Sequence, residues 1–142
     1  SKINLWKFWI LRKSYKNNKF YIDQDVVKYG KEILKKGAQS VIISLGGDGA
    51  VYVDEQQSIK AVNPQGKVIN TVGSGDSTVA GMVAGLESGL SIQDAFKQAV
   101  ASGTATAFEE DLATRDAIEK IKFQVTIKVL EGEWNEWEVQ NY

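Results

Sequence analysis

The stretch Asn70–Thr78 (Asn-Thr-Val-Gly-Ser-Gly-Asp-Ser-Thr) constrains this chain more than any other. A short β-branched segment, Lys67–Ile69, precedes it after the turn-forming Pro64–Gly66, so a strand is predicted on that side. The small apolar run Val79–Leu86 follows and predicts a helix that ends near Gly89. A glycine-rich turn is therefore expected to join a strand to the N-terminus of a helix.

Such a turn suits an anion. Helix N-termini leave backbone N–H groups unpaired and carry partial positive charge. Gly73 and Gly75 would let that backbone approach a phosphate closely. Asp76 stands on the same turn, where a carboxylate is unexpected unless it handles a proton or serves as a helix cap. The motif alone leaves both roles open. It is not a P-loop, because no Lys follows Gly75.

Composition excludes several kinds of chemistry. The 142 residues are enough for one domain with a core, and they contain neither Cys nor His. Disulfides, thiolate metal sites and histidine bases are thus excluded, and acid–base chemistry must use carboxylates, Lys or Tyr. The net charge of −1 gives no indication of nucleic acid or an anionic membrane as a partner. No apolar run reaches the roughly 18 residues of a membrane span, so a cytoplasmic protein is expected.

The rest of the chain alternates between helix and strand patterns. A helix over Asp23–Lys36 that ends at Gly37 is followed by a buried strand at Val41–Ile43. Further along, the pattern predicts strands at Ala50–Val53, Ser58–Val62 and Val125–Leu130, and helices over Ile92–Phe108 (capped by Ser91) and from a Thr114 cap to Ile121. This order predicts an α/β fold with a parallel-dominated sheet flanked by helices.

Two other stretches have both a structural and a ligand-binding interpretation. Ser44–Gly49 has three glycines in four residues, which is close to the chemistry of a tight hairpin but could also cradle phosphates with backbone N–H groups. The small residues of Ala99–Ala107 allow close approach, either by a neighbouring helix or strand or by a flat ligand ring.

The two ends of the chain are harder to interpret. Residues 1–22 mix aromatic and basic side chains, and the basic run within them is expected to be a solvated loop rather than a nucleic-acid patch. Residues 131–142 are expected to be an exposed or partner-covered tail. Tryptophans occur in both ends, at positions 6, 9, 134 and 137. Exposed aromatics and an unpaired sheet edge favour self-association as a homo-oligomer or pairing with a partner.

The two glycine loops together resemble a known family. Ser44–Ala50 and Asn70–Asp76, the latter with Ala80–Val83 at the right offset, are similar to the two C-terminal motifs of ribokinase-like, phosphofructokinase-B sugar kinases. Ala101–Ala107 with Glu110–Thr114 looks most like the bacterial 1-phosphofructokinase and tagatose-6-phosphate kinase branch. The resemblance covers roughly residues 23–130, which would form the ATP-binding and catalytic part of a ribokinase-like domain. Residues 1–22 would be a degenerate N-terminal segment and residues 131–142 a tail.

The resemblance implies a role for each matching residue. Asp76 would bind the sugar substrate's hydroxyl and take its proton as general base, beside an anion hole made by Gly73, Ser74 and Gly75. ATP would be held by Gly75 and by the first loop, namely Ser44, Leu45, Gly46, Gly47, Asp48 and Gly49. Residues 101–107 would flank the adenine. The implied partners are ATP, with Mg²⁺ whose ligands the sequence does not identify, and a sugar phosphate such as fructose 1-phosphate or tagatose 6-phosphate.

The chain also departs from the family pattern. Family members are much longer, and their N-terminal half carries the sugar site. At the place of the family's Lys-Pro-Asn-x-x-Glu motif this chain has Ile3 instead of Pro and Lys7 instead of the acidic residue. We therefore expect a C-terminal half that is a weak or inactive kinase alone. The alternative is a non-catalytic half-kinase that binds a nucleotide or phosphate and pairs with itself or a partner.

Overall fold

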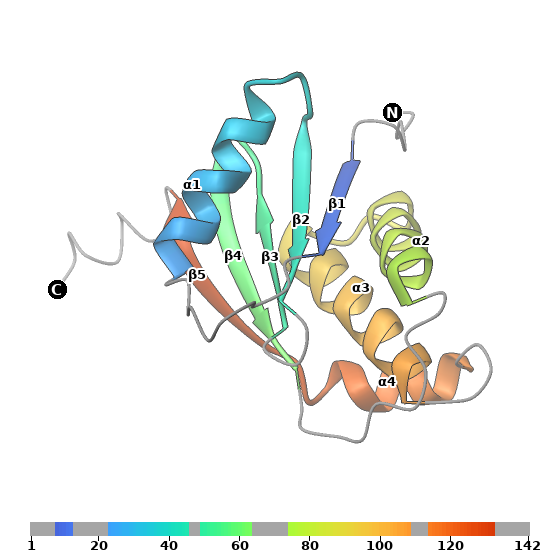
Figure 1. Ribbon diagram of the computed structural model, residues 1–142. Helices are drawn as coiled ribbons and strands as arrows, with labels where there is room; N and C mark the ends of the chain where they lie inside the picture. Colours follow the sequence, from blue (N-terminus) through green and yellow to red (C-terminus); the bar gives the residue numbers. More distant parts are fainter. Residues whose placement is uncertain (1–7, 13–22, 46–48, 64–73, 109–113, 133–142) are drawn as a thin grey trace, which may run out of the picture. The chain divides into compact units, whose positions relative to one another are not determined.

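The computed structural model describes residues 8–12, 23–45, 49–63, 74–108 and 114–132 (Figure 1). Its elements in chain order are β1 (Phe8–Arg12), α1 (Asp23–Leu34), β2 (Ser40–Ser44), β3 (Ala50–Val53), β4 (Gln57–Val62), α2 (Ser74–Glu87), α3 (Ile92–Ala107), α4 (Arg115–Lys122) and β5 (Thr126–Gly132). The residues form two compact units. Of the described residues, those from Ala61 to Ile127 belong to one unit, and those from Phe8 to Lys60 and from Lys128 to Gly132 belong to the other.

The strands form one five-stranded sheet in the order β1-β2-β3-β4-β5. β1 and β2 are parallel, with Phe8 opposite Ser40 and Arg12 opposite Ser44. β1 lies in the segment for which the sequence predicted no element. Its signal was weak because a strand of this kind is defined by pairing with a distant part of the chain.

β2 and β3 are antiparallel, with Val41 opposite Val53 and Ser44 opposite Ala50. The N–H of Leu45 donates to the carbonyl oxygen of Gly49 at 2.8 Å, so the chain reverses directly through the glycine loop. A parallel pair would need a crossover of a dozen or more residues. The prediction of a parallel-dominated sheet is therefore wrong for this pair, whereas the α/β class and the hairpin interpretation of the loop are confirmed.

Helix α1 covers one face of β2 and β3 (Figure 1). The buried cluster beneath it is aliphatic and comprises Val26, Val27, Ile33, Ala38, Val41, Ile43, Leu45, Val51 and Val53. Gly30 brings the helix close to the sheet, because a Cβ on Gly30 would lie 2.8 Å from a methyl carbon of Val53. Gly37, predicted to end the helix, follows it with a φ of 112°, a conformation that favours glycine.

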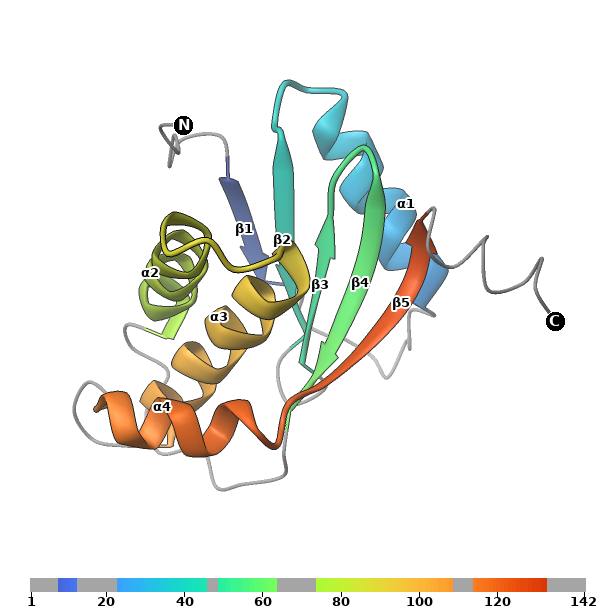
Figure 2. The same cartoon turned by 180° about the vertical axis from the view of Figure 1, so that it is seen from behind.

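The other unit contains α2, α3 and α4, and α3 contacts both of the other helices (Figure 2). Ser91 and Thr114 cap α3 and α4 as predicted: the Ser91 hydroxyl accepts from the N–H of Asp94, and the Thr114 hydroxyl accepts from the N–H of Ala117. No helix within the described ranges is long and apolar enough to cross a bilayer.

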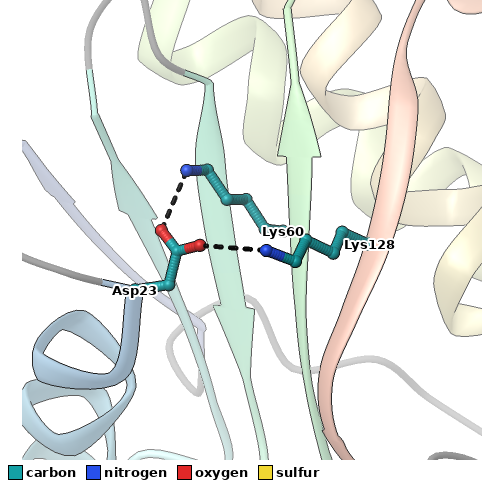
Figure 3. A network of polar contacts seen from close by, with 3 residues as sticks. All are labelled: Asp23, Lys60 and Lys128. Carbon is teal, nitrogen blue, oxygen red and sulfur yellow. Dashed lines mark hydrogen bonds and ion pairs between the residues drawn. The ribbon is translucent and has the colours of Figure 1, made fainter.

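An ion-pair network joins α1 to the sheet (Figure 3). The Asp23 carboxylate at the start of α1 lies 2.9 Å from Lys60 Nζ of β4 and 3.7 Å from Lys128 Nζ of β5. Lys60 is the more buried of the two lysines, with 18% of its side chain exposed against 65% for Lys128. The closer pair therefore ties the helix N-terminus to β4.

Candidate active site

The strongest candidate residue, Asp76, lies in the first turn of α2. The helix begins at Ser74 and runs for 14 residues, so its backbone dipoles add at this end. Asp76 is exposed, and no side chain or backbone group of the described residues donates a hydrogen bond or forms an ion pair with it. Its position stabilises the helix as an acidic first-turn residue does. Among the described residues nothing occupies its carboxylate.

The backbone beside Asp76 is open. A Cβ built on Gly75 meets nothing within 4 Å, so no described atom crowds this side of the backbone. Ser74 is partly exposed and opens the helix. Gly73, the third member of the predicted anion hole, and the rest of the predicted strand and turn at 64–73 lie outside the described residues.

The predicted ATP loop belongs to the other unit. Ser44 ends β2 and is half-buried, and Gly49 precedes β3 with a φ of 100°. Leu45 is 2% exposed and belongs to the apolar cluster under α1, and its N–H is already bonded to Gly49. Neither the side chain nor the N–H group of Leu45 is therefore available to a nucleotide. Gly46, Gly47 and Asp48 lie outside the described residues.

The two loops thus fall in separate units. That one ATP molecule contacts both loops stays a prediction from the resemblance. The departures at Ile3 and Lys7, and the tryptophan side chains of both chain ends, fall outside the residues whose side chains are described.

Small residues bring α2 and α3 together. A Cβ on Gly81 would lie 3.0 Å from the Cα of Ala99, and one on Gly85 would lie 3.0 Å from the Cα of Ala95. Sequence analysis left open whether a helix, a strand or a flat ligand approaches the run Ala99–Ala107. The structure confirms a neighbouring helix, and residues 101–106 are buried. That the same run also flanks an adenine stays a prediction.

Sequence analysis missed the polar contacts that hold the start of α2 in place. Thr106 Oγ1 donates to Ser77 Oγ at 3.0 Å, directly after Asp76 in the chain. Thr104 Oγ1 donates to Asn63 Oδ1, also at 3.0 Å. The available signal was two threonines in an otherwise Ala-rich stretch, which indicates polar partners but does not identify them.

The described residues contain no group of three or more His, Cys, Asp or Glu side chains that could hold a metal ion. A Mg²⁺ ion that arrives with ATP needs only one or two carboxylates, because phosphate oxygens and water complete its coordination. The residues described here therefore identify no protein ligand for such an ion.

Comparison with known proteins identifies the family. The chain is 40% identical over 104 residues to 1-phosphofructokinase of Bacillus subtilis, which covers 73% of this chain and 34% of that protein. It is 36% identical over 113 residues to D-tagatose-1-phosphate kinase of Bacillus licheniformis, which covers 80% of this chain and 37% of that protein. The chain thus spans about a third of the length of the curated relatives it matches.

Solved structures give the same result. A crystal structure from Staphylococcus aureus, provisionally assigned as a phosphofructokinase, superposes with a TM-score of 0.79 at 75% identity over 82% of this chain and 38% of that one. The family model for pfkB carbohydrate kinases matches residues 16–119, well over half of the chain. The chain therefore belongs to the pfkB family of carbohydrate kinases, and its fold is that of ribokinase-like sugar kinases.

Proposed function

We propose that this chain provides the catalytic residues for ATP-dependent phosphoryl transfer to a phosphorylated hexose, of the 1-phosphofructokinase or tagatose-6-phosphate kinase type. The observation that carries the proposal is Asp76: an exposed carboxylate without a protein partner among the described residues, on the first turn of a 14-residue helix. Family membership and the names of the curated relatives support a sugar phosphate as the acceptor.

In the proposed reaction, Asp76 accepts the proton of the acceptor hydroxyl. The freed oxygen forms a bond to the γ-phosphorus of ATP, and the bond from that phosphorus to the bridging oxygen breaks. ADP leaves with the electron pair, while the proton stays on the Asp76 carboxyl group until solvent removes it. Such a transfer depends on positioning and charge stabilisation rather than on covalent catalysis.

The remaining site residues have supporting roles in the proposal. The backbone N–H groups of Gly73, Ser74 and Gly75 stabilise negative charge on the transferring phosphoryl group, as donors fixed at a helix N-terminus can. Ser44–Gly49 binds ATP through its backbone, which fits the burial of the Leu45 side chain. Mg²⁺ bound to ATP would neutralise part of the phosphate charge.

The test is a kinase assay on the full-length protein carrying this sequence, with ATP, Mg²⁺ and either fructose 1-phosphate or tagatose 6-phosphate. Asp76→Asn should lower kcat by about 10²–10⁴-fold, the usual contribution of a general base, and leave the Kd for ATP within about threefold. Asp25→Asn is the matched control, because Asp25 is also an exposed acidic residue in the first turn of a helix. It should leave kcat unchanged. Full activity in Asp76→Asn would overturn the proposal.

We also propose that these 142 residues alone are a weak kinase or inactive, because the resemblance assigns the sugar site to sequence that they do not match. Calorimetry that measures ATP binding to the isolated chain, together with the kinase assay, distinguishes a kinase from the non-catalytic alternative. ATP binding by the chain together with turnover by the full-length protein supports the kinase. ATP or phosphate binding without turnover in either supports a non-catalytic binding module.

A further inference from the structure

Helices α2 and α3 run antiparallel in a fixed register. Gly85 faces Ala95, and Gly81 faces Ala99 one turn earlier in α2 and one turn later in α3. One turn further, the same register brings the start of α2 to Gly103, and Thr106, three residues later in α3, donates its hydroxyl proton to Ser77 Oγ. Thr106 is 3% exposed, so water does not compete for its hydroxyl.

The first turn of α2 also contacts the backbone of α3. A Cβ on Gly103 would lie 3.0 Å from the carbonyl oxygen of Ser74 and would overlap the Thr78 hydroxyl. That hydroxyl donates to the same Ser74 carbonyl at 2.9 Å. The turn that carries Asp76 therefore packs closely on α3 at Gly103, with the Thr78 hydroxyl in the contact.

The same turn of α3 also holds the chain ahead of α2. Thr104, two residues before Thr106, donates its hydroxyl proton to Asn63 Oδ1 and is 8% exposed. Asn63 is the last described residue before segment 64–73, and Ser77 lies shortly after that segment. One turn of α3 thus binds the chain on both sides of the predicted anion loop.

We infer that Thr106 is a positioning residue for phosphoryl transfer: through its hydrogen bond to Ser77 it fixes the first turn of α2 and hence the place of Asp76. The inference rests on the proposed function, because Asp76 is the group being positioned. The Thr106 hydroxyl is buried and bonded to Ser77, so its loss should act on kcat rather than on ATP binding. Misplacement of a reacting group by about 1 Å can cost up to about a hundredfold in rate.

Four variants of the full-length protein test this. Thr106→Val keeps the shape of the side chain but removes the donor, and Ser77→Ala removes the acceptor from the other side of the same bond. Both should lower kcat about tenfold with the KM for ATP within about twofold. Thr106→Ser keeps the hydroxyl and should stay within about twofold of the parent. Ser88→Ala is the matched control and should change nothing, because the Ser88 hydroxyl, directly after α2, donates to the carbonyl oxygen of Gly85 at the far end of the helix from Asp76.

A second pair of measurements separates positioning from other effects. Added to Asp76→Asn, Thr106→Val should cause no further loss of kcat, since the group it positions is gone. Amide hydrogen exchange of residues 75–78 should be faster in Thr106→Val and return to the parent rate in Thr106→Ser.

Three results would overturn the inference while leaving the proposed function intact. They are a parent-like kcat in Thr106→Val, a loss that adds fully to that of Asp76→Asn, and unchanged exchange of residues 75–78. Failure of the proposed function itself would give a different result. If Asp76→Asn retains full activity, the proposed function falls, whatever the exchange measurement says of the bond between Thr106 and Ser77.

Discussion

Lys60 Nζ lies 2.9 Å from Asp23 Oδ1, which ties β4 to the first residue of α1 (Figure 3). Lys128 approaches the same carboxylate only to 3.7 Å and from a largely exposed position. Exposed ion pairs contribute roughly 0–1 kcal/mol, whereas removing one partner of a more buried pair leaves the other charge poorly compensated and costs more. The two lysines should therefore differ in what they contribute to stability.

We predict that Lys60→Met lowers the free energy of unfolding by about 1–2 kcal/mol and that Lys128→Met lowers it by less than about 0.5 kcal/mol. Urea unfolding of both variants at low and at high salt measures this. Salt should reduce the small Lys128 effect further, because that pair is the more exposed. Equal losses of unfolding free energy in the two variants would show that the Lys60–Asp23 pair is not the stronger of the two.

Two glycines of α2 should respond in opposite ways to alanine. A methyl group on Gly81 would lie 2.7 Å from Ser102 Oγ and 3.0 Å from the backbone of Ala99, so Gly81→Ala should destabilise the chain by about 1–3 kcal/mol. Gly75 has open space, and Gly75→Ala should leave stability unchanged or raise it by up to about 1 kcal/mol.

Calorimetry that measures ATP binding to the same two variants tests whether Gly75 belongs to the proposed site. Gly75→Ala should weaken ATP binding although the protein is no less stable, because its methyl group stands where the phosphate is proposed to approach. Unchanged ATP affinity in Gly75→Ala would remove Gly75 from the site. A gain in stability in Gly81→Ala would contradict the tight contact of α2 with α3.

Tyr52 should make stability depend on alkaline pH. Burial of its ring raises the pKa of the Tyr52 hydroxyl above the ordinary value, and the charge of Asp54, to which that hydroxyl donates at 2.8 Å, raises it further. Above about pH 10 the tyrosine ionises in the unfolded chain but stays protonated in the folded one. The unfolded state then binds fewer protons, so stability is full below pH 10 and falls as pH rises.

Urea unfolding at pH 8 and pH 11 measures this dependence. The slope that Tyr52 contributes is at most about 1.4 kcal/mol per pH unit. Tyr52→Phe should remove that contribution and leave the part due to the other tyrosines. An identical pH dependence in the parent and in Tyr52→Phe would show that the hydroxyl ionises equally in both states.

Ser58 on β4 carries a hydroxyl that is buried without a hydrogen-bond partner among the described residues. The side chain is 1% exposed, so the hydroxyl has given up its water. A buried unsatisfied polar group costs about 1–3 kcal/mol. Ser58→Ala should therefore raise the free energy of unfolding by about 1 kcal/mol in urea titrations, whereas a loss of stability would indicate that the hydroxyl has a partner.

Local signals in the sequence predicted most elements. Ser91 and Thr114 identified the starts of two helices because a cap bonds within its own turn. Gly37 identified the end of α1 for a similar reason, since its positive φ is a local requirement. Features that depend only on residues a few positions away could therefore be predicted from the sequence.

Features that depend on distant pairing were not. β1 is a strand because Phe8–Arg12 pairs with β2, about thirty residues away, and nothing within those five residues requires it. The antiparallel turn through Leu45 and Gly49 was anticipated as a hairpin, yet the overall expectation of a parallel sheet conflicted with it. Likewise the bond of Thr106 to Ser77 depends on the packing of two helices and could not be predicted from the motif around Asp76.

The close contact of α2 with α3 at Gly81 and Gly85 has a consequence for how this chain can change over evolutionary time. A side chain can accommodate an altered neighbour by switching rotamer, but a bare Cα has no such freedom. Added volume at these glycines can be accepted only by displacing α2 as a whole, and Asp76 would move with it. Under α1, where Val, Ile and Leu side chains meet, substitutions can compensate one another. Along the glycines of α2, a substitution that changes the packing would also change the position of Asp76.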